Sequence, residues 1–136
     1  MTTDFDSTFG GTHSDMRQLV GYDMTHAAAK QVYEASGVDP KDIPVVELHD
    51  CFAHNELITY EGLGLCPEGG AEKFVRDGAN TYGGKVVTNP SGGLLSKGHP
   101  LGATGAMILG TLLDELERRN GRYGLVTLCI GGGMGI

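Results

Sequence analysis

The chain contains the stretch Pro44-Val45-Val46-Glu47-Leu48-His49-Asp50-Cys51, a short and mostly apolar run that ends in reactive side chains. Its β-branched valines are typical of a buried parallel strand, which has both faces covered by other elements. In sheets of parallel strands, ligands bind at the carboxyl ends of the strands. The stretch therefore predicts a buried strand that delivers His49 and Cys51 to a ligand site.

Helices and strands alternate on both sides of this stretch. From the apolar spacing and the positions of glycine and proline, we expect a helix at about residues 25–36, a helix at 52–63, a strand at 85–88, a helix from 103 to about 120 and a last strand at 123–128. Residues 65–80 are rich in glycine, proline and charge, and they are expected to form a surface loop. The alternation predicts the α/β class, with βαβ units and a mostly parallel sheet.

Local signals at the helix ends refine these expectations. Asp23 or Thr25 can cap the start of the first helix, and Gly37 suits the left-handed conformation that follows a helix end. In the helix after residue 103, Asn120 predicts the end, and a solvated face is predicted by the charged residues Asp114, Glu115, Glu117, Arg118 and Arg119. The apolar positions expected to face the core are Ala28, Val32 and Ala35 in the first helix, and Met107, Ile108, Leu112, Leu113 and Leu116 in the last.

Length and composition limit what the chain can be. Its 136 residues suffice for one domain or for half of a larger two-domain protein. Lys and Arg total 10 against 17 Asp and Glu, and the net charge of −7 argues against nucleic acid or an anionic membrane as a partner. We expect an irregular lead-in at residues 1–20 and the α/β domain at residues 21–136.

The cysteines and the apolar segments bear on location. Cys51, Cys66 and Cys129 are odd in number and widely spaced, a pattern that favours a reducing compartment over a disulfide framework. The first residues lack the basic and apolar segments of a signal peptide, and no apolar run approaches the roughly 20 residues of a membrane span. We therefore expect a cytoplasmic protein without a membrane span.

Three segments carry reactive side chains to the same edge of the predicted sheet. His49 and Cys51 follow the first strand, His99 lies in the glycine-rich segment after the second strand, and Cys129 follows the last strand. Imidazole supplies a base near neutral pH, and a thiol of pKa about 8.5 supplies a nucleophile or an acid. Neighbouring glycines leave backbone N–H groups available to a developing oxyanion. These residues predict acyl or carbanion chemistry at sulfur.

Other interpretations of the same residues carry less weight. A zinc site built from Cys51, His49 and His54 would need about four closely placed ligands, and no paired Cys/His motif follows. The glycines at 131–135 do not make a dinucleotide fingerprint, which opens a helix and precedes an acidic residue by about 20 positions. Buried cysteines are also often only small core residues. The remaining candidates are a solvated or phosphate-contacting Lys97, a structural Cys66, and the surface residues His13 and His26.

Three segments together resemble a known family. Residues 89–105, which run from Asn89-Pro90-Ser91-Gly92-Gly93 through Gly98-His99-Pro100-Leu101-Gly102, resemble the histidine loop of the thiolase superfamily, and residues 129–133 resemble its C-x-G loop. Residues 49–52 are similar to the variant found in the thiolase domain of sterol carrier protein X and its bacterial relatives, often labelled lipid-transfer proteins. The resemblance covers about residues 21–135. It implies a thiolase-like βαβαβ half with a mixed, mostly parallel sheet.

The resemblance implies a role for each matched residue. His99 would activate a nucleophilic cysteine, His49 would position an oxygen in the oxyanion hole, and the Gly131 N–H would contribute to a second hole. Another cysteine would move the α-proton of acetyl-CoA, and both Cys129 and Cys51 match positions that serve this purpose in different members. Coenzyme A would be a substrate, and no covalently bound cofactor or metal is implied.

The family's nucleophilic cysteine, its first βαβαβ half and its CoA-covering loop domain have no counterpart in this sequence. The resemblance therefore implies the C-terminal half of a thiolase, inactive alone. Its expected partners are an acyl-CoA substrate, an N-terminal thiolase half and further copies in a homo-oligomer. In a eukaryote, the family implies a peroxisomal location.

Three functions follow from these observations. The first is a thiolase that cleaves or condenses fatty or sterol side-chain acyl-CoA. The second is a thiolase-fold retro-aldolase for steroid side chains, which requires an OB-fold partner and in which the catalytic cysteines are replaced. The third is a non-catalytic module that binds acyl-CoA or lipid. Cys51 and Cys129 favour the first.

Overall fold

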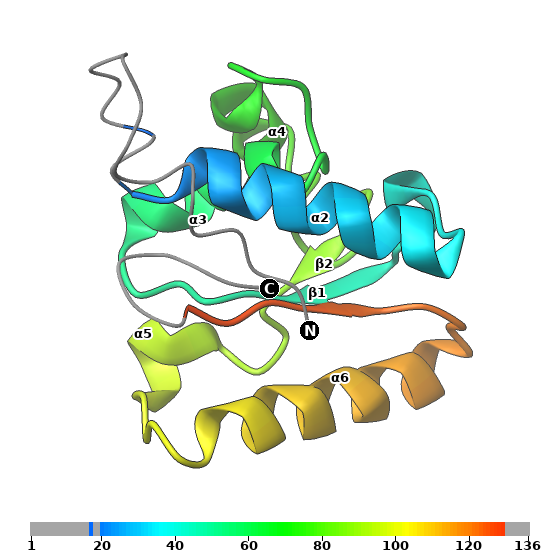
Figure 1. Ribbon diagram of the computed structural model, residues 1–136. Coiled ribbons are helices and arrows are strands. Elements are labelled where there is room, and N and C mark those ends of the chain that lie inside the picture. Colours follow the sequence, from blue (N-terminus) through cyan, green and yellow to red (C-terminus); the bar gives the residue numbers. More distant parts are fainter. Residues whose placement is uncertain (1–16, 18–19, 130–136) are drawn as a thin grey trace.

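The computed structural model describes residue 17 and residues 20–129 of the chain (Figure 1). The irregular lead-in expected at residues 1–20 lies almost wholly outside the described residues. The elements in chain order are α2 (Tyr22–Ser36), the 3₁₀ helix η1 (Pro40–Asp42), β1 (Val45–Glu47), α3 (Ala53–Gly62), α4 (Ala71–Arg76), β2 (Val87–Thr88), α5 (Gly93–Lys97), α6 (Thr104–Arg119) and β3 (Leu125–Val126).

The sheet has three strands in the order β2-β1-β3. Val45 of β1 pairs with Val87 of β2, and Val46 pairs with Leu125 of β3, both in parallel. Every residue of β1 is buried, as expected for a central strand with covered faces. The α/β class and the βαβαβ order are confirmed, and among the described residues the sheet is parallel throughout.

Helices cover both faces of this sheet. Figure 1 shows α2, α3 and α4 on one side and α5 and α6 on the other. The buried apolar cluster includes residues from β1, from the middle of α2, from the end of α3 and from the segment around α4. Because the two layers leave only the strand ends uncovered, the loops at the carboxyl edge are where polar side chains can gather. No helix in the described part of the chain is long and apolar enough to cross a membrane.

Helix α2 starts differently from the sequence-based expectation. It begins at Tyr22 after a left-handed Gly21, and no side chain caps it, so the expected cap by Asp23 or Thr25 is wrong. Its buried residues, which include Ala28, all lie in its first half, whereas the expected core residue Ala35 near its end is exposed. Gly37 has a φ of 69° and donates to the Tyr33 carbonyl, which confirms the predicted end.

Residues 65–80 are not simply a surface loop. They contain α4, and Ala71 and Phe74 of this helix are buried. The Phe74 ring meets the buried Tyr60 ring edge-on at 5.3 Å, and the Ala71 N–H donates to Glu61. A helix of six residues with two core contacts has no detectable apolar period, so its stability comes from these tertiary contacts.

Helix α6 matches the prediction in extent, and Asn120 ends it in the left-handed conformation with a φ of 53°. Ile108 and Leu112 are buried as expected, but Leu113 is 53% exposed. The charged end is not a wholly solvated face, because the buried Glu115 carboxylate binds both following arginines. This cluster therefore fixes the last turn of the helix.

Candidate functional site

The carboxyl ends of the parallel strands bring two predicted site residues into contact. The His49 ring, after β1, meets the His99 ring, after α5, edge-on, with 4.9 Å between the ring centroids and an interplanar angle of 86°. The thiols after β1 and β3 are also close, since Cys129 acts electrostatically on Cys51. Four of the five predicted site residues are therefore gathered at one edge of the sheet. Gly131 lies outside the described residues.

The contact between His99 and Thr104 favours one tautomer of the exposed imidazole. The Nδ1 atom of His99 lies 2.8 Å from the Thr104 hydroxyl oxygen, and that hydroxyl donates to the Pro100 carbonyl at 3.0 Å. A hydroxyl has a single hydrogen, and both contacts are satisfied when Thr104 donates to the Pro100 carbonyl and accepts from His99. The Nδ1 atom then carries the proton, and the lone pair on Nε2 is available to act as a base.

His49 is a buried imidazole that favours the neutral form. Burial, and then the neighbouring His99, lower the pKa of His49 below its ordinary value of 6.5, while Asp50 opposes this shift. A neutral imidazole has one N–H donor and one acceptor nitrogen. Within the described part of the chain, the buried Nδ1 of His49 has no hydrogen-bond partner. A buried, unsatisfied nitrogen of this kind is suited to a ligand oxygen or a water molecule.

The two site thiols differ in their local structure. Burial is the main cause that raises the pKa of Cys51 above its ordinary value, and Cys129 raises it further. The Phe52 and Cys51 N–H groups at the helix start lower the pKa of Cys51, but burial outweighs them. Phe52 is 71% exposed and does not pack Cys51 into the core. Cys129 is partly exposed and lies three residues after the end of β3.

The other candidate residues lie outside the cluster formed by His49, Cys51, His99 and Cys129. Cys66 is buried near α4, and burial raises its pKa to about 11, which suits a structural thiol. His26 and His54 are exposed, and His13 lies outside the described residues. Among the residues that the structure describes, no three His, Cys, Asp or Glu side chains are grouped so that they could hold a metal ion.

Sequence analysis missed three residues that support the cluster. The buried Thr104 orients His99, and the buried carboxylates of Glu47 and Asp50 accept hydrogen bonds from the backbone of residues 91 and 94. The sequence did contain a signal for Glu47, because a glutamate inside a run of buried strand residues needs a specific partner. Its partner Ser91, 44 residues away, could not be found from local spacing.

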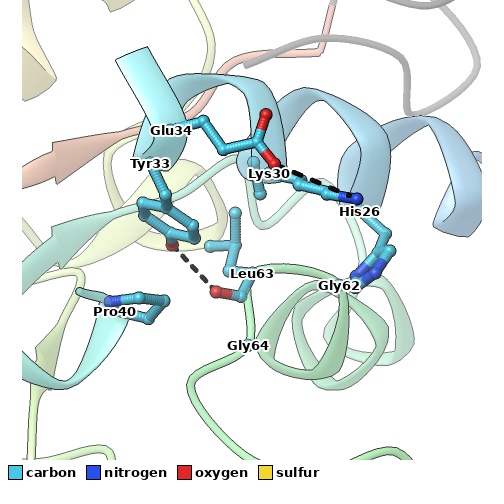
Figure 2. Close-up of a pocket in the computed structure, with 9 residues that line it drawn as sticks. His26, Lys30, Tyr33, Glu34, Pro40, Gly62, Leu63 and Gly64 are labelled. Atoms are coloured by element: carbon cyan, nitrogen blue, oxygen red, sulfur yellow. Dashed lines mark hydrogen bonds and ion pairs between the residues drawn. The ribbon is translucent and has the colours of Figure 1, made fainter. Parts of the chain in front are cut away.

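A cavity of about 250 Å³ lies away from the histidines, between α2 and the end of α3. Figure 2 shows Tyr33 beside it, with its hydroxyl donating to the Leu63 carbonyl, and the Lys30–Glu34 ion pair on one side. None of the predicted catalytic residues lines this cavity.

Comparison with known proteins places this arrangement in a family. The family described as thiolase C-terminal domain-like matches residues 7–122. The chain is 63% identical over 105 residues to sterol carrier protein 2 of Bos taurus, covering 77% of this chain and 19% of that protein. It is 47% identical over 110 residues to the benzoylsuccinyl-CoA thiolase subunit BbsB of Thauera aromatica, covering 81% of this chain and 29% of that subunit.

A solved structure shares the fold. The chain matches a structure titled Ltp2-ChsH2(DUF35) aldolase with a TM-score of 0.71 and 25% sequence identity, covering 85% of this chain and 30% of that chain. The chain therefore spans less than a third of the length of each of these relatives. The family match extends over most of the sequence and includes the histidine loop. This chain therefore belongs to the thiolase C-terminal domain-like family.

Proposed function

We propose that this chain is the C-terminal half of a thiolase-type acyl-CoA acyltransferase that cleaves or condenses fatty or sterol side-chain acyl-CoA. The observation that carries the proposal is the pair of touching imidazoles, His49 and His99, with the Nδ1 atom of His99 in contact with Thr104. Two thiols lie at the same sheet edge. Relatives named thiolase and acetyl-CoA acetyltransferase support the same reaction class.

In this proposal, His99 takes the proton from a nucleophilic cysteine that the N-terminal half contributes. The resulting thiolate attacks the carbonyl carbon of the acyl-CoA, the thioester C–S bond breaks, and the coenzyme A sulfur leaves with the proton that His99 returns. The neutral imidazole of His49 holds an oxygen, either of the thioester or of a water molecule, where negative charge develops. The Gly131 N–H contributes to the second oxyanion hole.

The α-proton step is assigned to Cys129. Its thiolate removes a proton from the acetyl carbon and forms a thiol, and the carbanion then attacks the acyl-enzyme carbonyl. The acyl C–S bond breaks, and the nucleophilic cysteine leaves as a thiolate. Cys51 is the less suitable base because burial raises its pKa, which makes its thiolate harder to form. It can instead donate a proton or pack beside Cys129.

Coenzyme A is the proposed co-substrate, and the proposed protein partners are an N-terminal thiolase half and a second copy of the enzyme. Large apolar side chains flank the site without being buried: Phe52 is 71% exposed, Leu95 62% and Leu101 85%. Exposed apolar side chains grouped beside a site favour a covering partner.

Two observations favour other functions. The structural likeness to a protein titled an aldolase supports a retro-aldolase that acts with an OB-fold partner. The names sterol carrier protein 2 and non-specific lipid-transfer protein-like 2 among the relatives support a lipid-binding module. The two thiols at the site favour the thiolase over both, because neither alternative needs them.

The test is thiolysis of acetoacetyl-CoA by the chain joined to an N-terminal thiolase half that carries the nucleophilic cysteine. His99→Ala should lower kcat by about 10²- to 10⁴-fold, the usual contribution of a general acid or base. His54→Ala is the matched control, because His54 is exposed on α3, and it should stay within about twofold.

Full thiolysis by the His99→Ala protein would contradict the proposed role of the imidazole. Absence of thiolysis in the parent, together with steroid side-chain cleavage when an OB-fold partner is added, would favour the aldolase. Lipid binding without either reaction would favour the non-catalytic module.

A further inference from the structure

The segment that leads to His99 is held by a buried carboxylate inside the central strand. Glu47 has no exposed surface, and its two oxygens accept hydrogen bonds from the N–H and the hydroxyl of Ser91, each at 2.7 Å. Burying a carboxylate requires much free energy, and a neutral oxygen could have accepted one of these hydrogen bonds with a smaller loss. The carboxylate, in contrast, holds the backbone and the side chain of Ser91 at once.

A second carboxylate holds the next turn of the same segment. Asp50 is 4% exposed, and its Oδ1 accepts the Leu94 N–H at 2.5 Å. Its Oδ2 lies against Gly93, where an added Cβ atom would come within 2.0 Å of it. Gly93 also has a φ of 67°, so both the space and the backbone conformation require glycine.

Hydrogen bonds connect the residues held by the two carboxylates to each other and to the residue before His99. The Ser91 hydroxyl oxygen, held by Glu47, accepts the Gly93 N–H at 3.1 Å. The Leu94 carbonyl accepts the Gly98 N–H at 2.9 Å, and Gly98 immediately precedes His99. Leu94 is thus bound through its N–H to Asp50 and through its carbonyl to the residue before His99. Asp50 itself stands between His49 and Cys51 in the sequence.

We propose that Glu47 and Asp50 are positioning residues, which hold α5 so that the His99 ring stays against the His49 ring. The proposal rests on the proposed function only for the catalytic use of this ring contact. Neither carboxylate touches the reacting atoms. Asp50 has the more direct effect because a single side chain joins the segment that carries His49 to the segment that carries His99.

The experiment measures the ring contact in the 136-residue chain by NMR, as the cross-relaxation peak between the His49 and His99 ring protons. Asp50→Ala removes the acceptor of the Leu94 N–H, and it should abolish the peak. Asp50→Asn keeps an oxygen at the Oδ1 position, and it should retain at least half of the peak intensity. This rescue separates positioning from a general loss of stability.

Asp39→Ala is the matched control. Asp39 also accepts a backbone N–H, from Lys41, but in the exposed turn before β1. Its removal should leave the peak unchanged. Ser91→Ala, which deletes only one hydroxyl, is the second variant and should weaken the peak by about half.

An unchanged peak in a folded Asp50→Ala chain would overturn the proposal. If Asp50→Ala does not fold, Ser91→Ala decides, and a peak equal to that of Asp39→Ala would overturn it. Loss of the peak in Asp50→Ala with retention in Asp50→Asn supports it. Because the readout is a distance between two rings, it stands even if the assembled enzyme proves not to be a thiolase.

Discussion

Replacing Thr104 with valine should change the tautomer of His99 without removing the imidazole. Valine has nearly the shape of threonine but lacks the hydroxyl that accepts the His99 Nδ1 proton at 2.8 Å. Thr104 is 1% exposed, so no water replaces the hydroxyl at its own position. His99 is then free to carry its proton on Nε2, the nitrogen that must be unprotonated to act as a base.

The size of the effect follows from one hydrogen bond. A typical intramolecular hydrogen bond contributes about 1 kcal/mol. Such a loss changes the ratio of the two tautomers by about fivefold, and the rate, which follows the fraction of the active tautomer, falls by at most that factor. The Thr104→Val protein should therefore show a kcat that is lower by up to about fivefold at an unchanged KM. Because His99 is exposed, solvent can replace part of the interaction, which keeps the effect below that of losing the imidazole.

The assay combines two measurements. Nitrogen-15 chemical shifts of the His99 ring report which nitrogen carries the proton, and thiolysis by the assembled enzyme reports kcat. Thr104→Ser is the matched control, because serine keeps the hydroxyl, and it should retain the parent tautomer. The reasoning fails if Thr104→Val leaves the Nδ1–H tautomer as fully populated as in the parent.

Three further outcomes are expected. The 136-residue chain alone should show no acetoacetyl-CoA thiolysis above background, because no residue matches the family's acyl-carrying cysteine. If the chain alone does catalyse thiolysis and Cys129→Ala abolishes it, a thiol of this half can serve as the nucleophile. Sedimentation and dye binding should reveal self-association through exposed apolar side chains such as Leu101, which is 85% exposed, and Leu113, which is 53% exposed. A monodisperse monomer that binds no dye would argue against an uncovered interface. Burial and His99 lower the pKa of His49 from 6.5, so the unfolded chain binds this proton more readily, and the free energy of unfolding should fall as the pH drops below about 6.5. Urea titrations at several pH values should show a weaker fall in the His49→Gln chain. An equal dependence of the free energy of unfolding on pH in both chains would contradict the assignment.

The sequence predicts the central part of the site because a simple rule connects it to the fold. β1 is recognisable as a buried parallel strand, and the carboxyl ends of parallel strands meet at one sheet edge. His49, Cys51, His99 and Cys129 follow such ends or the loops next to them, so their proximity could be anticipated from chain order.

The parts that could not be predicted depend on contacts between distant residues. Helix α4 is stabilised by Phe74 against Tyr60, and its own sequence has no helical period. The burial of Glu47 depends on Ser91, and Glu115 is buried although it lies in a charged run. In each case a local pattern marks the residue as polar, while a tertiary partner decides where it lies.

The exchange of the α-protons of acetyl-CoA in deuterated buffer tests the central claim most directly, since it reports proton removal separately from acyl transfer. The assembled enzyme, with its N-terminal half, should incorporate deuterium, and Cys129→Ala should lower the exchange rate by about 10²- to 10⁴-fold while acyl-enzyme formation survives. Cys51→Ala should have a mild effect. The opposite ranking would assign the proton to Cys51, and no exchange in the assembled parent enzyme would contradict the proposal that this site performs thiolase chemistry.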